Sequence, residues 1–257
     1  MSMLNRFGLL PIVCVCLVAS SPFMDGQGNY LALATVAFDV NYQPGVTKED
    51  AGKVADYLQK DYSYLSEKLG LEFKRKVEVR IYDGVGKFLS EANQKKPWRT
   101  VVYLRGVLHV QPVQALLQRN VFEQSLSYEL ARAVLDQAVD KGCPQWLREA
   151  YAVYHCGEMA NLTPAYGARL ESFGDLDQDI QEYPNPPQRN DVHYILGMTM
   201  KFLFERYGED KVTGLFRSFD GKTPVETVFK KLFNEDFPRI EKAWSRNISS
   251  VTKTLKK

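Results

Sequence analysis

The spacing of apolar residues changes near the middle of this chain, and that change limits the folds that the chain can adopt. Up to about residue 110, short runs of alternating or β-branched apolar residues predict strands, with one long helical pattern between them. From about residue 121 onwards, the apolar residues recur at helical spacing almost to the C-terminus. Strands followed by helices are typical of an α+β domain.

The first strands and the long helix have clear boundaries in the sequence. Residues 35–42 are rich in β-branched and aromatic side chains, and residues 77–82 alternate between apolar and polar side chains, so both segments predict strands. Between them, a helical pattern begins after Thr47, a good N-cap residue, and ends at Gly70, where glycine favours helix termination. The order strand, long helix, strand is therefore expected.

A hairpin is expected next. Residues 100–104 and 107–110 are apolar runs on either side of Arg105-Gly106, a two-residue connection that suits a tight β-turn. Residues 88–93 before them predict a short helix.

Helical patterns fill the second half of the chain. A proline-containing segment, residues 172–190, is interpreted as a loop between them. We expect one domain over residues 30–255, with a sheet-containing lobe over about 30–140 and a helical lobe over about 141–255. The expected helices cover residues 121–139, 146–156, a segment that opens at Thr163-Pro164, and residues 191–207, 209–219, 223–234 and 237–254.

Composition excludes some classes of protein. The chain has 257 residues, and 45% of them are hydrophobic, which is enough for a sizeable core. Its formal net charge is only +2, whereas a nucleic-acid-binding protein needs a basic excess on one face. We therefore expect no nucleic-acid partner.

The N-terminus resembles an export signal. Arg6 precedes an apolar run over residues 7–19, and small residues follow at 19–21. The run of about 13 residues is shorter than the roughly 20 that a membrane-spanning helix needs. We expect residues 1–21 to be a cleaved signal peptide and the protein to be periplasmic or extracellular; an uncleaved membrane anchor is the alternative. Export permits a disulfide, but the helix expected between Cys143 and Cys156 would hold them too far apart, so free thiols are favoured.

Two helical segments carry a recognisable pair of motifs. Residues 126–133 read Leu-Ser-Tyr-Glu-Leu-Ala-Arg-Ala, and residues 144–154 read Pro-Gln-Trp-Leu-Arg-Glu-Ala-Tyr-Ala-Val-Tyr. The pair resembles the peptidase MA-like (gluzincin) metallopeptidases, whose first helix carries H-E-x-x-H and whose next helix opens with P-x-W-L-x-E-G-x-A. The resemblance implies a zincin-like fold, with a mixed sheet and one long helix followed by a mainly helical lobe. It extends over about residues 36–245.

The resemblance also implies a zinc site, which this sequence retains only in part. In active relatives, two histidines four residues apart share one helix face, and a glutamate from the next helix completes the zinc ligands. Here Tyr128 and Arg132 stand at the two histidine positions. Glu129 matches the general-base glutamate that activates the metal-bound water, Glu149 matches the third ligand, and Ala150 replaces the usual glycine.

The loss of both histidines predicts a protein without zinc. Arginine is always protonated, so Arg132 would point a cation towards the place of the metal ion. We expect Arg132 to pair with Glu149, with Glu129, or with both, and so to hold the two helices together without a metal. Glu129 would then be a vestigial general base, and we expect a pseudoenzyme.

The remaining histidines do not restore the motif. His109, His155 and His193 have no partner histidine at a spacing of four residues, so each is interpreted as a surface or locally hydrogen-bonded histidine. In related enzymes a tyrosine or histidine from a later helix stabilises the oxyanion, and Tyr194 is the candidate here, with a core tyrosine as the alternative. His155 and Cys156 are adjacent on a helix and point apart, so they form a poor catalytic dyad.

Three functions remain open. The first is a binding protein that holds a peptide or protein segment in the vestigial cleft, along an edge strand within residues 100–110. The second is an active metallopeptidase with non-standard zinc ligands. The third is a structural or assembly component. Contact with a membrane is expected only through the signal segment, if it is not cleaved.

Overall fold

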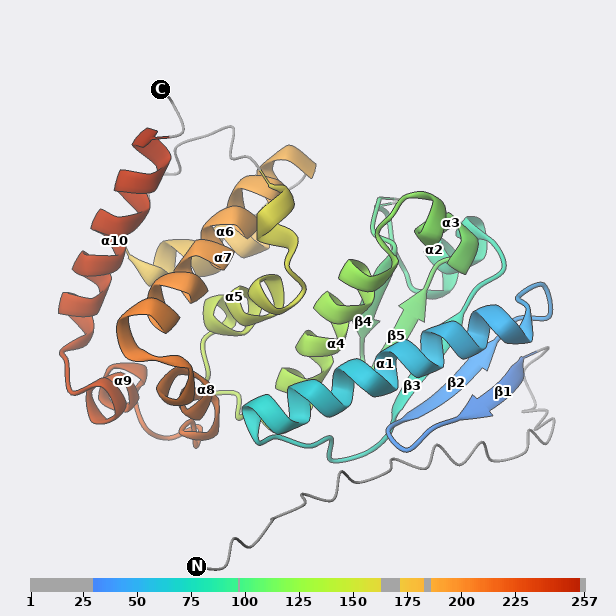
Figure 1. Cartoon of the computed structure of the whole chain (residues 1–257), viewed down its shortest axis with the longest axis horizontal. Helices are drawn as coiled ribbons and strands as arrows, with labels where there is room; N and C mark the ends of the chain where they lie inside the picture. Colours follow the sequence, from blue (N-terminus) through green and yellow to red (C-terminus); the bar gives the residue numbers. More distant parts are fainter. Residues whose placement is uncertain (1–29, 97, 163–171, 183–185, 255–257) are drawn as a thin grey trace, which may run out of the picture.

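The computed structural model describes residues 30–96, 98–162, 172–182 and 186–254. It has a five-stranded sheet at one end of the molecule and a helical part at the other, so the α+β prediction is confirmed (Figure 1). The predicted signal peptide lies outside the described residues. None of the described helices is long and apolar enough to cross a membrane. The strands are β1 (Leu31–Ala34), β2 (Phe38–Tyr42), β3 (Val77–Ile81), β4 (Val101–Leu104) and β5 (Val107–Val110).

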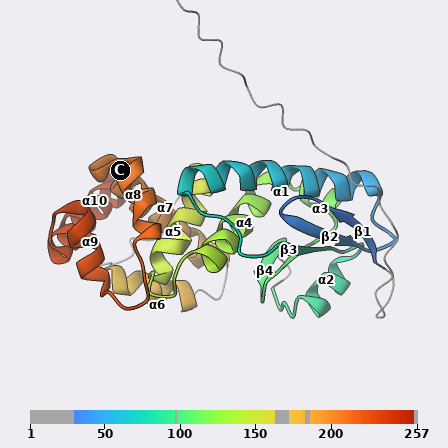
Figure 2. The same cartoon turned by 90° about the horizontal axis from the view of Figure 1, so that it is seen from below.

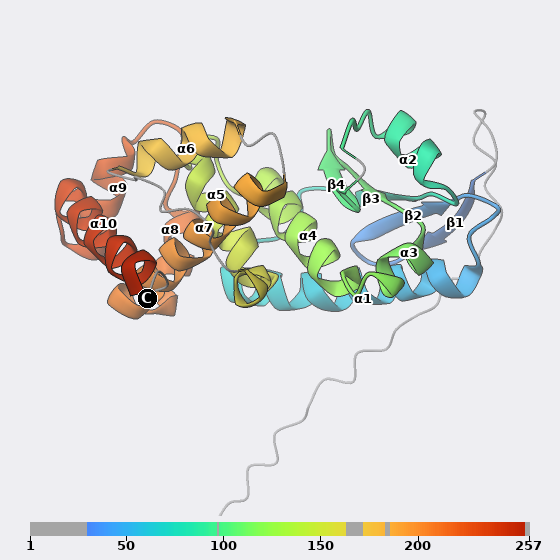
Figure 3. The same ribbon diagram turned by 90° about the horizontal axis from the view of Figure 1, so that it is seen from above.

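Helices account for most of the rest of the described chain. α1 extends from the sheet to the helical part, where it meets α8 (Figures 1 and 3). The helices are α1 (Lys48–Leu69), α2 (Val85–Glu91), α3 (Val113–Gln118), α4 (Phe122–Ala138), α5 (Gln145–His155), the 3₁₀ helix η1 (Glu158–Asn161), α6 (Phe173–Glu182), α7 (Pro186–Tyr207), α8 (Glu209–Arg217), α9 (Val225–Phe233) and α10 (Phe237–Thr254).

The sheet is mixed, with the strand order β1-β2-β3-β5-β4. The three central strands run parallel, whereas β1 and β4 pair antiparallel at the two edges. α1 lies across one face of the sheet and the short helix α2 lies on the other (Figure 2). The edge strand β4 faces α4, so the first motif helix packs beside the outer edge of the sheet (Figure 1).

The predicted long helix is confirmed at both ends. The side chain of Thr47 accepts a hydrogen bond from the backbone N–H of Asp50 at 3.0 Å, as an N-cap residue does. Gly70 ends the helix with a φ of 60°, a left-handed conformation that glycine adopts without a steric penalty. Apolar residues between these ends are fully buried, so α1 is fixed by packing as well as by its caps.

The predicted hairpin is also present. Arg105 and Gly106 both have positive φ angles, 53° and 85°, as the central residues of a type I′ turn require. The prediction that the edge strand lies within residues 100–110 holds for β4 alone, since β5 is an inner strand between β3 and β4. Whether a hairpin strand becomes an edge depends on its neighbours elsewhere in the chain, which a local pattern does not show.

The loop predicted over residues 172–190 is wrong. α6 occupies Phe173–Glu182, and α7 begins at Pro186. Proline is compatible with the first turn of a helix, where its missing N–H has no intrahelical acceptor, so the prolines open α7 instead of preventing it. Phe173, Leu176 and Ile180 place one face of α6 in the core. The helix predicted to open at Thr163-Pro164 lies outside the described residues.

The second motif helix, α5, lies at the centre of the helical part. It packs against α4, α6 and α7, and the ring of Trp146 stacks on that of Phe173 at 4.2 Å between centroids. The thiols of Cys143 and Cys156, on either side of this helix, are free, as predicted. α4 and α5 are thus rigid neighbours, which fixes the relative positions of the motif residues that they carry.

Candidate functional site

The two motif helices bring Tyr128, Glu129, Arg132 and Glu149 together, and we call these four residues the arginine cluster. Arg132 Nη1 lies 2.7 Å from Glu129 Oε2, and Arg132 Nε lies 3.0 Å from Glu149 Oε1. The hydroxyl of Tyr128 donates to the other oxygen of Glu149 at 2.5 Å. The prediction that Arg132 pairs with one or both glutamates is confirmed, and it pairs with both.

The carboxylates of the cluster are more deeply buried than its cation. The side chains of Glu129 and Glu149 are 3% and 9% exposed, whereas that of Arg132 is 27% exposed. Burial alone would raise the pKa of Glu149, but the guanidinium of Arg132 and the hydroxyl of Tyr128 outweigh it and leave the pKa below its usual value. Glu149 is therefore an anion held in place by fixed donors.

The arginine cluster does not fit a zinc ion. The guanidinium of Arg132 lies between the carboxylates of Glu129 and Glu149 and contacts both. It cannot lose its proton to become a ligand. Throughout the described chain, no three His, Cys, Asp or Glu side chains form a group that could hold a metal ion. The cluster is a set of ion pairs joined by the hydrogen bond from Tyr128.

The outer edge of β4 lies directly against the arginine cluster. The backbone N–H of Tyr103 donates to Glu129 Oε2 at 3.0 Å. The hairpin register pairs Val102 with His109 and Leu104 with Val107, and the N–H of Gln111 donates to the carbonyl of Thr100. In an antiparallel pair the hydrogen-bonded positions alternate, so the backbone groups of Val101 and Tyr103 point away from β5, towards α4.

Two cavities flank the arginine cluster along this edge, and together with the outer edge of β4 we call them the β4 groove. One has a volume of about 240 Å³, and the other has a volume of about 700 Å³. The smaller includes Trp98, Arg99, Val101, Arg119, Tyr128 and Glu129 in its wall. The larger includes Tyr103, Arg105, Arg132, Cys143, Arg148 and Glu149.

A second ionic network adjoins the first, and the sequence did not reveal it. Arg189 of α7 binds both carboxylate oxygens of Glu158 at 2.6 and 3.2 Å, and His193 Nδ1 lies 2.7 Å from Glu158 Oε2. The ring of Tyr128 lies against His193, with 5.3 Å between centroids, and so joins the two networks. No spacing signal predicts this network, because η1 and α7 meet only in the folded chain.

Protonation in this second network follows from burial. Burial would raise the pKa of Glu158, but the hydrogen bond from His193 and the charge of Arg189 reverse the effect and lower it to about 2. Burial lowers the pKa of His193, although its bond to Glu158 opposes the change. Near neutral pH, a neutral His193 therefore donates its Nδ1 proton to an ionised Glu158.

The other residues singled out in the sequence lie in different surroundings. Tyr194 packs against the main core and lines neither cavity of the β4 groove, whereas its neighbour His193 reaches Tyr128. His109 is buried in β5, where its Nδ1 lies 2.7 Å from the hydroxyl of Tyr82. Burial lowers the pKa of His109 to about 4, so it is a neutral core residue.

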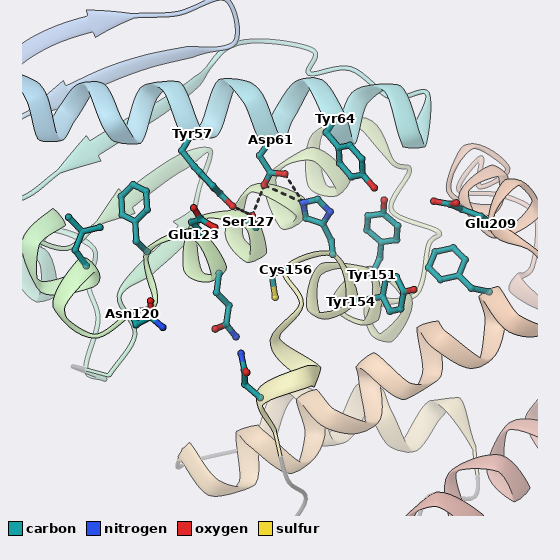
Figure 4. A pocket seen from close by; sticks show the side chains of 16 residues that line it. Tyr57, Asp61, Tyr64, Asn120, Glu123, Ser127, Tyr151, Tyr154, Cys156 and Glu209 are labelled. Carbon is teal, nitrogen blue, oxygen red and sulfur yellow. Dashed lines mark hydrogen bonds and ion pairs between the residues drawn. The ribbon is translucent and has the colours of Figure 1, made fainter.

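His155 lies on the opposite side of α4, in a third cavity of about 650 Å³ between α1, α4 and α5 (Figure 4). Asp61 of α1 accepts a hydrogen bond from Ser127 at 2.6 Å and lies 3.0 Å from His155 Nε2. Tyr57 extends the network to Ser127 at 2.7 Å. We call this cavity, with its lining side chains, the tyrosine cavity.

Among the described residues of the tyrosine cavity, no nucleophile is paired with a histidine base. Ser127 and His155 both contact Asp61, so the carboxylate separates the hydroxyl from the imidazole. Burial raises the pKa of the Cys156 thiol to about 12, which keeps the sulfur protonated near neutral pH. The expectation that His155 and Cys156 are a poor dyad agrees with this environment.

The chain matches no protein-family model and no curated protein.

Proposed function

We propose that this protein is a non-catalytic, exported relative of the gluzincin metallopeptidases that binds an extended peptide or protein segment in the β4 groove. The mixed sheet with one long helix, followed by a helical part that contains the two motif helices, supports a zincin-like fold. The observation that carries the proposal is the outer edge of β4, with outward-facing backbone groups beside the arginine cluster.

Catalysis by the metallopeptidase mechanism is not proposed for this site. A general base in that mechanism works on water that a metal ion has made acidic. Here one oxygen of Glu129 receives the guanidinium of Arg132 and the N–H of Tyr103, so this carboxylate stabilises the structure. Catalytic zinc sites need a metal ion with one position left open for water or substrate. Here both glutamates are occupied by the guanidinium of Arg132.

Peptide binding needs backbone partners and side-chain pockets, and the β4 groove has both. An extended segment can add to a free sheet edge through main-chain hydrogen bonds, while alternate side chains enter neighbouring pockets. Val101 and the carbonyl of Tyr103 offer such partners. The two cavities lie on either side of the arginine cluster and both include residues of β4 or of its flanks.

The charge of the β4 groove favours an acidic segment. Arg99 and Arg119 line the smaller cavity, and Arg105 and Arg148 line the larger one. Among the carboxylates in these walls, Glu129 and Glu149 are paired with Arg132, and Glu158 is paired with Arg189. Asp136 and Asp177 of the larger cavity accept hydrogen bonds from neutral groups, so the acidic segment is expected to bind beside the arginines and away from these two side chains. Guanidinium groups bind carboxylates with two parallel hydrogen bonds, so acidic side chains or a C-terminal carboxylate suit these positions.

Selection from a phage-displayed library of random octapeptides would test the proposal. We expect enriched peptides to carry acidic residues, and synthetic copies to bind the purified chain in fluorescence polarisation. Val101→Pro, which removes an outward N–H, should weaken binding about tenfold, as loss of one hydrogen bond predicts. Val101→Ala keeps this N–H and is the matched control, with thermal melting used to confirm that both variants fold.

Two outcomes would contradict the proposal. Equal binding by the Val101→Pro and Val101→Ala variants would show that the β4 edge is not used. Close to one equivalent of zinc by elemental analysis of the purified protein, lost in a Glu149→Gln variant, would point to metallopeptidase chemistry instead. We expect less than about a tenth of an equivalent, since structural and catalytic zinc sites bind tightly when their ligands are present.

A further inference from the structure

The tyrosine cavity has a chemistry different from that of the β4 groove. Its volume of about 650 Å³ falls within the usual range for small-molecule sites. Among the described residues, its wall contains the carboxylates of Asp61, Glu123 and Glu209 and the ring of His155, and it contains no lysine or arginine. Six aromatic side chains line it, namely Tyr57, Tyr64, Phe122, Tyr151, Tyr154 and Phe204.

Two of the aromatic side chains of this cavity are exposed. Among the described residues, six large hydrophobic side chains are exposed, and three of them, Tyr64, Leu117 and Tyr154, line this single cavity. Tyr64 is 50% exposed and Tyr154 is 40% exposed. Exposed apolar side chains that gather in a hollow mark binding sites more often than those scattered singly.

The two ends of the cavity combine rings with carboxylates. Tyr64, Tyr151, Tyr154 and Glu209 gather at one end, and Glu123 lies towards the other (Figure 4). Asp61 lies between them, where it contacts the hydroxyl of Ser127 and the ring of His155 (Figure 4).

Lys68, at the rim of the cavity, carries an ammonium group that lies close to both an aromatic ring and a carboxylate. The ammonium of Lys68 lies 5.9 Å from the centroid of the Tyr64 ring and 3.1 Å from Glu209 Oε1. Lys68 thus neutralises Glu209 at the rim, whereas Asp61 and Glu123 have no lysine or arginine beside them in the cavity wall that the structure describes. Aromatic faces attract cations through their quadrupole, and nearby carboxylates add direct charge attraction.

We propose that the tyrosine cavity binds an organic ammonium group, with the tyrosine rings around it and Asp61 and Glu123 supplying the negative charge. Such a group occurs on small amines with an apolar body and on lysine side chains of proteins. The two sources share the chemistry and differ in what surrounds the ammonium. This site is separate from the β4 groove, on the other side of α4.

Calorimetric titration of the full chain with two matched pairs of probes would test the proposal. One pair is choline and its uncharged isostere 3,3-dimethylbutan-1-ol. The other is Nα-acetyl-lysine methylamide and the same compound acetylated on Nε. We expect saturable binding of at least one cation, weakened by added salt, and no detectable binding of its neutral partner. The pair that binds more tightly identifies the source of the ammonium group.

Variants at the surface of the cavity separate binding from folding. Tyr154→Leu should weaken binding of the preferred cation about two- to fivefold, as loss of one exposed cation–π contact predicts, whereas Tyr154→Phe should preserve it. Glu123→Gln should also weaken binding. Glu226→Gln is the matched control, because Glu226 is likewise an exposed glutamate in the first turn of a helix.

The proposal fails if the neutral compounds bind as tightly as the cations, or if neither cation binds. It also fails if Tyr154→Phe and Tyr154→Leu bind the cation equally well. Thermal melting of each variant would confirm that a loss of binding is not a loss of structure.

Discussion

The buried carboxylates on the two sides of α4 have different kinds of partner. Towards β4, Glu129 is paired with the guanidinium of Arg132. Towards α1, the hydroxyl of Ser127 donates to Asp61, and the ring of His155 also contacts that carboxylate. The β4 side therefore pairs its carboxylates with an arginine of α4, whereas the carboxylate of Asp61 has no lysine or arginine partner among the described residues.

This difference separates a structural cluster from a binding surface. A buried ion pair that loses one partner leaves an uncompensated charge, so the arginine cluster fixes α4 against α5. In the ammonium site that we propose, Asp61 lies in an aromatic cavity and contributes its charge to ligand binding. Mutations on the two sides of α4 should accordingly differ in their effect on stability.

The largest effect is expected from Arg132. Arg132→Ala leaves Glu129 and Glu149 buried without their shared cation, so the free energy of unfolding should fall by about 3–5 kcal/mol. Chemical denaturation of the purified chain would measure the change. Arg246→Ala, at an exposed position of α10, is the control and should change stability by less than about 0.5 kcal/mol. If the two variants were equally stable, the arginine cluster would have no role in holding the helices together.

The second largest effect is expected from acid, which should weaken the ionic network of Glu158, Arg189 and His193. Because the pKa of Glu158 is lowered to about 2, its contribution is present above the unfolded value near 4.5 and is lost as pH falls towards 2. Such a shift is worth about 3 kcal/mol. His109 and His193 act in the same direction at higher pH, since their lowered pKa values mean that the unfolded chain takes up protons first below about 6.5.

The measurement is the free energy of unfolding as a function of pH. In Glu158→Gln the loss of stability between pH 4.5 and 2 should be smaller than in the native chain by about 3 kcal/mol. Glu226→Gln, the exposed control, should leave the curve unchanged. An unchanged curve in Glu158→Gln would show that the network with Arg189 and His193 does not stabilise the ionised carboxylate.

A smaller effect is expected from Asp61. Asp61→Asn keeps the size of the side chain and one acceptor oxygen but loses a charged partner for Ser127 and His155. We expect stability to fall by about 1.5 kcal/mol, the usual value of a hydrogen bond to a charged group. Denaturation under the conditions used for Arg132→Ala would test the comparison directly. A loss as large as that of Arg132→Ala would show that both sides of α4 are structural.

The smallest effect on stability is expected from Glu123. Its exposed position predicts a change below about 0.5 kcal/mol for Glu123→Gln, although binding of an ammonium compound should weaken. Denaturation and calorimetric titration of the same preparation would measure both. A large loss of stability together with unchanged binding would reverse the interpretation of the tyrosine cavity.

Local patterns were enough to predict much of the fold. The cap at Thr47, the left-handed Gly70 and the hairpin at Arg105-Gly106 depend only on residues close in the chain, so their signals survive without tertiary context. The prolines of residues 172–190 misled, because proline both breaks helices and opens them, and the sequence alone does not say which.

The arginine cluster was predictable for a related reason. Glu129 and Arg132 are three residues apart on one helix, and the resemblance placed Glu149 on the next helix, 17 residues after Arg132. The sequence by itself therefore determined which side chains would meet there. It could not say whether Arg132 pairs with one glutamate or with both.

Only the tertiary structure decided the rest of the two sites. Asp61 and His155 are 94 residues apart, and Glu158 and His193 are 35 residues apart. Contacts at such separations depend on how whole helices pack, which no residue spacing encodes. In the same way, sheet order made β4 an edge strand and β5 an inner one. Helix faces and turns depend on interactions between residues close in the sequence. Cavities and sheet edges depend on how elements that are distant in the sequence pack against one another.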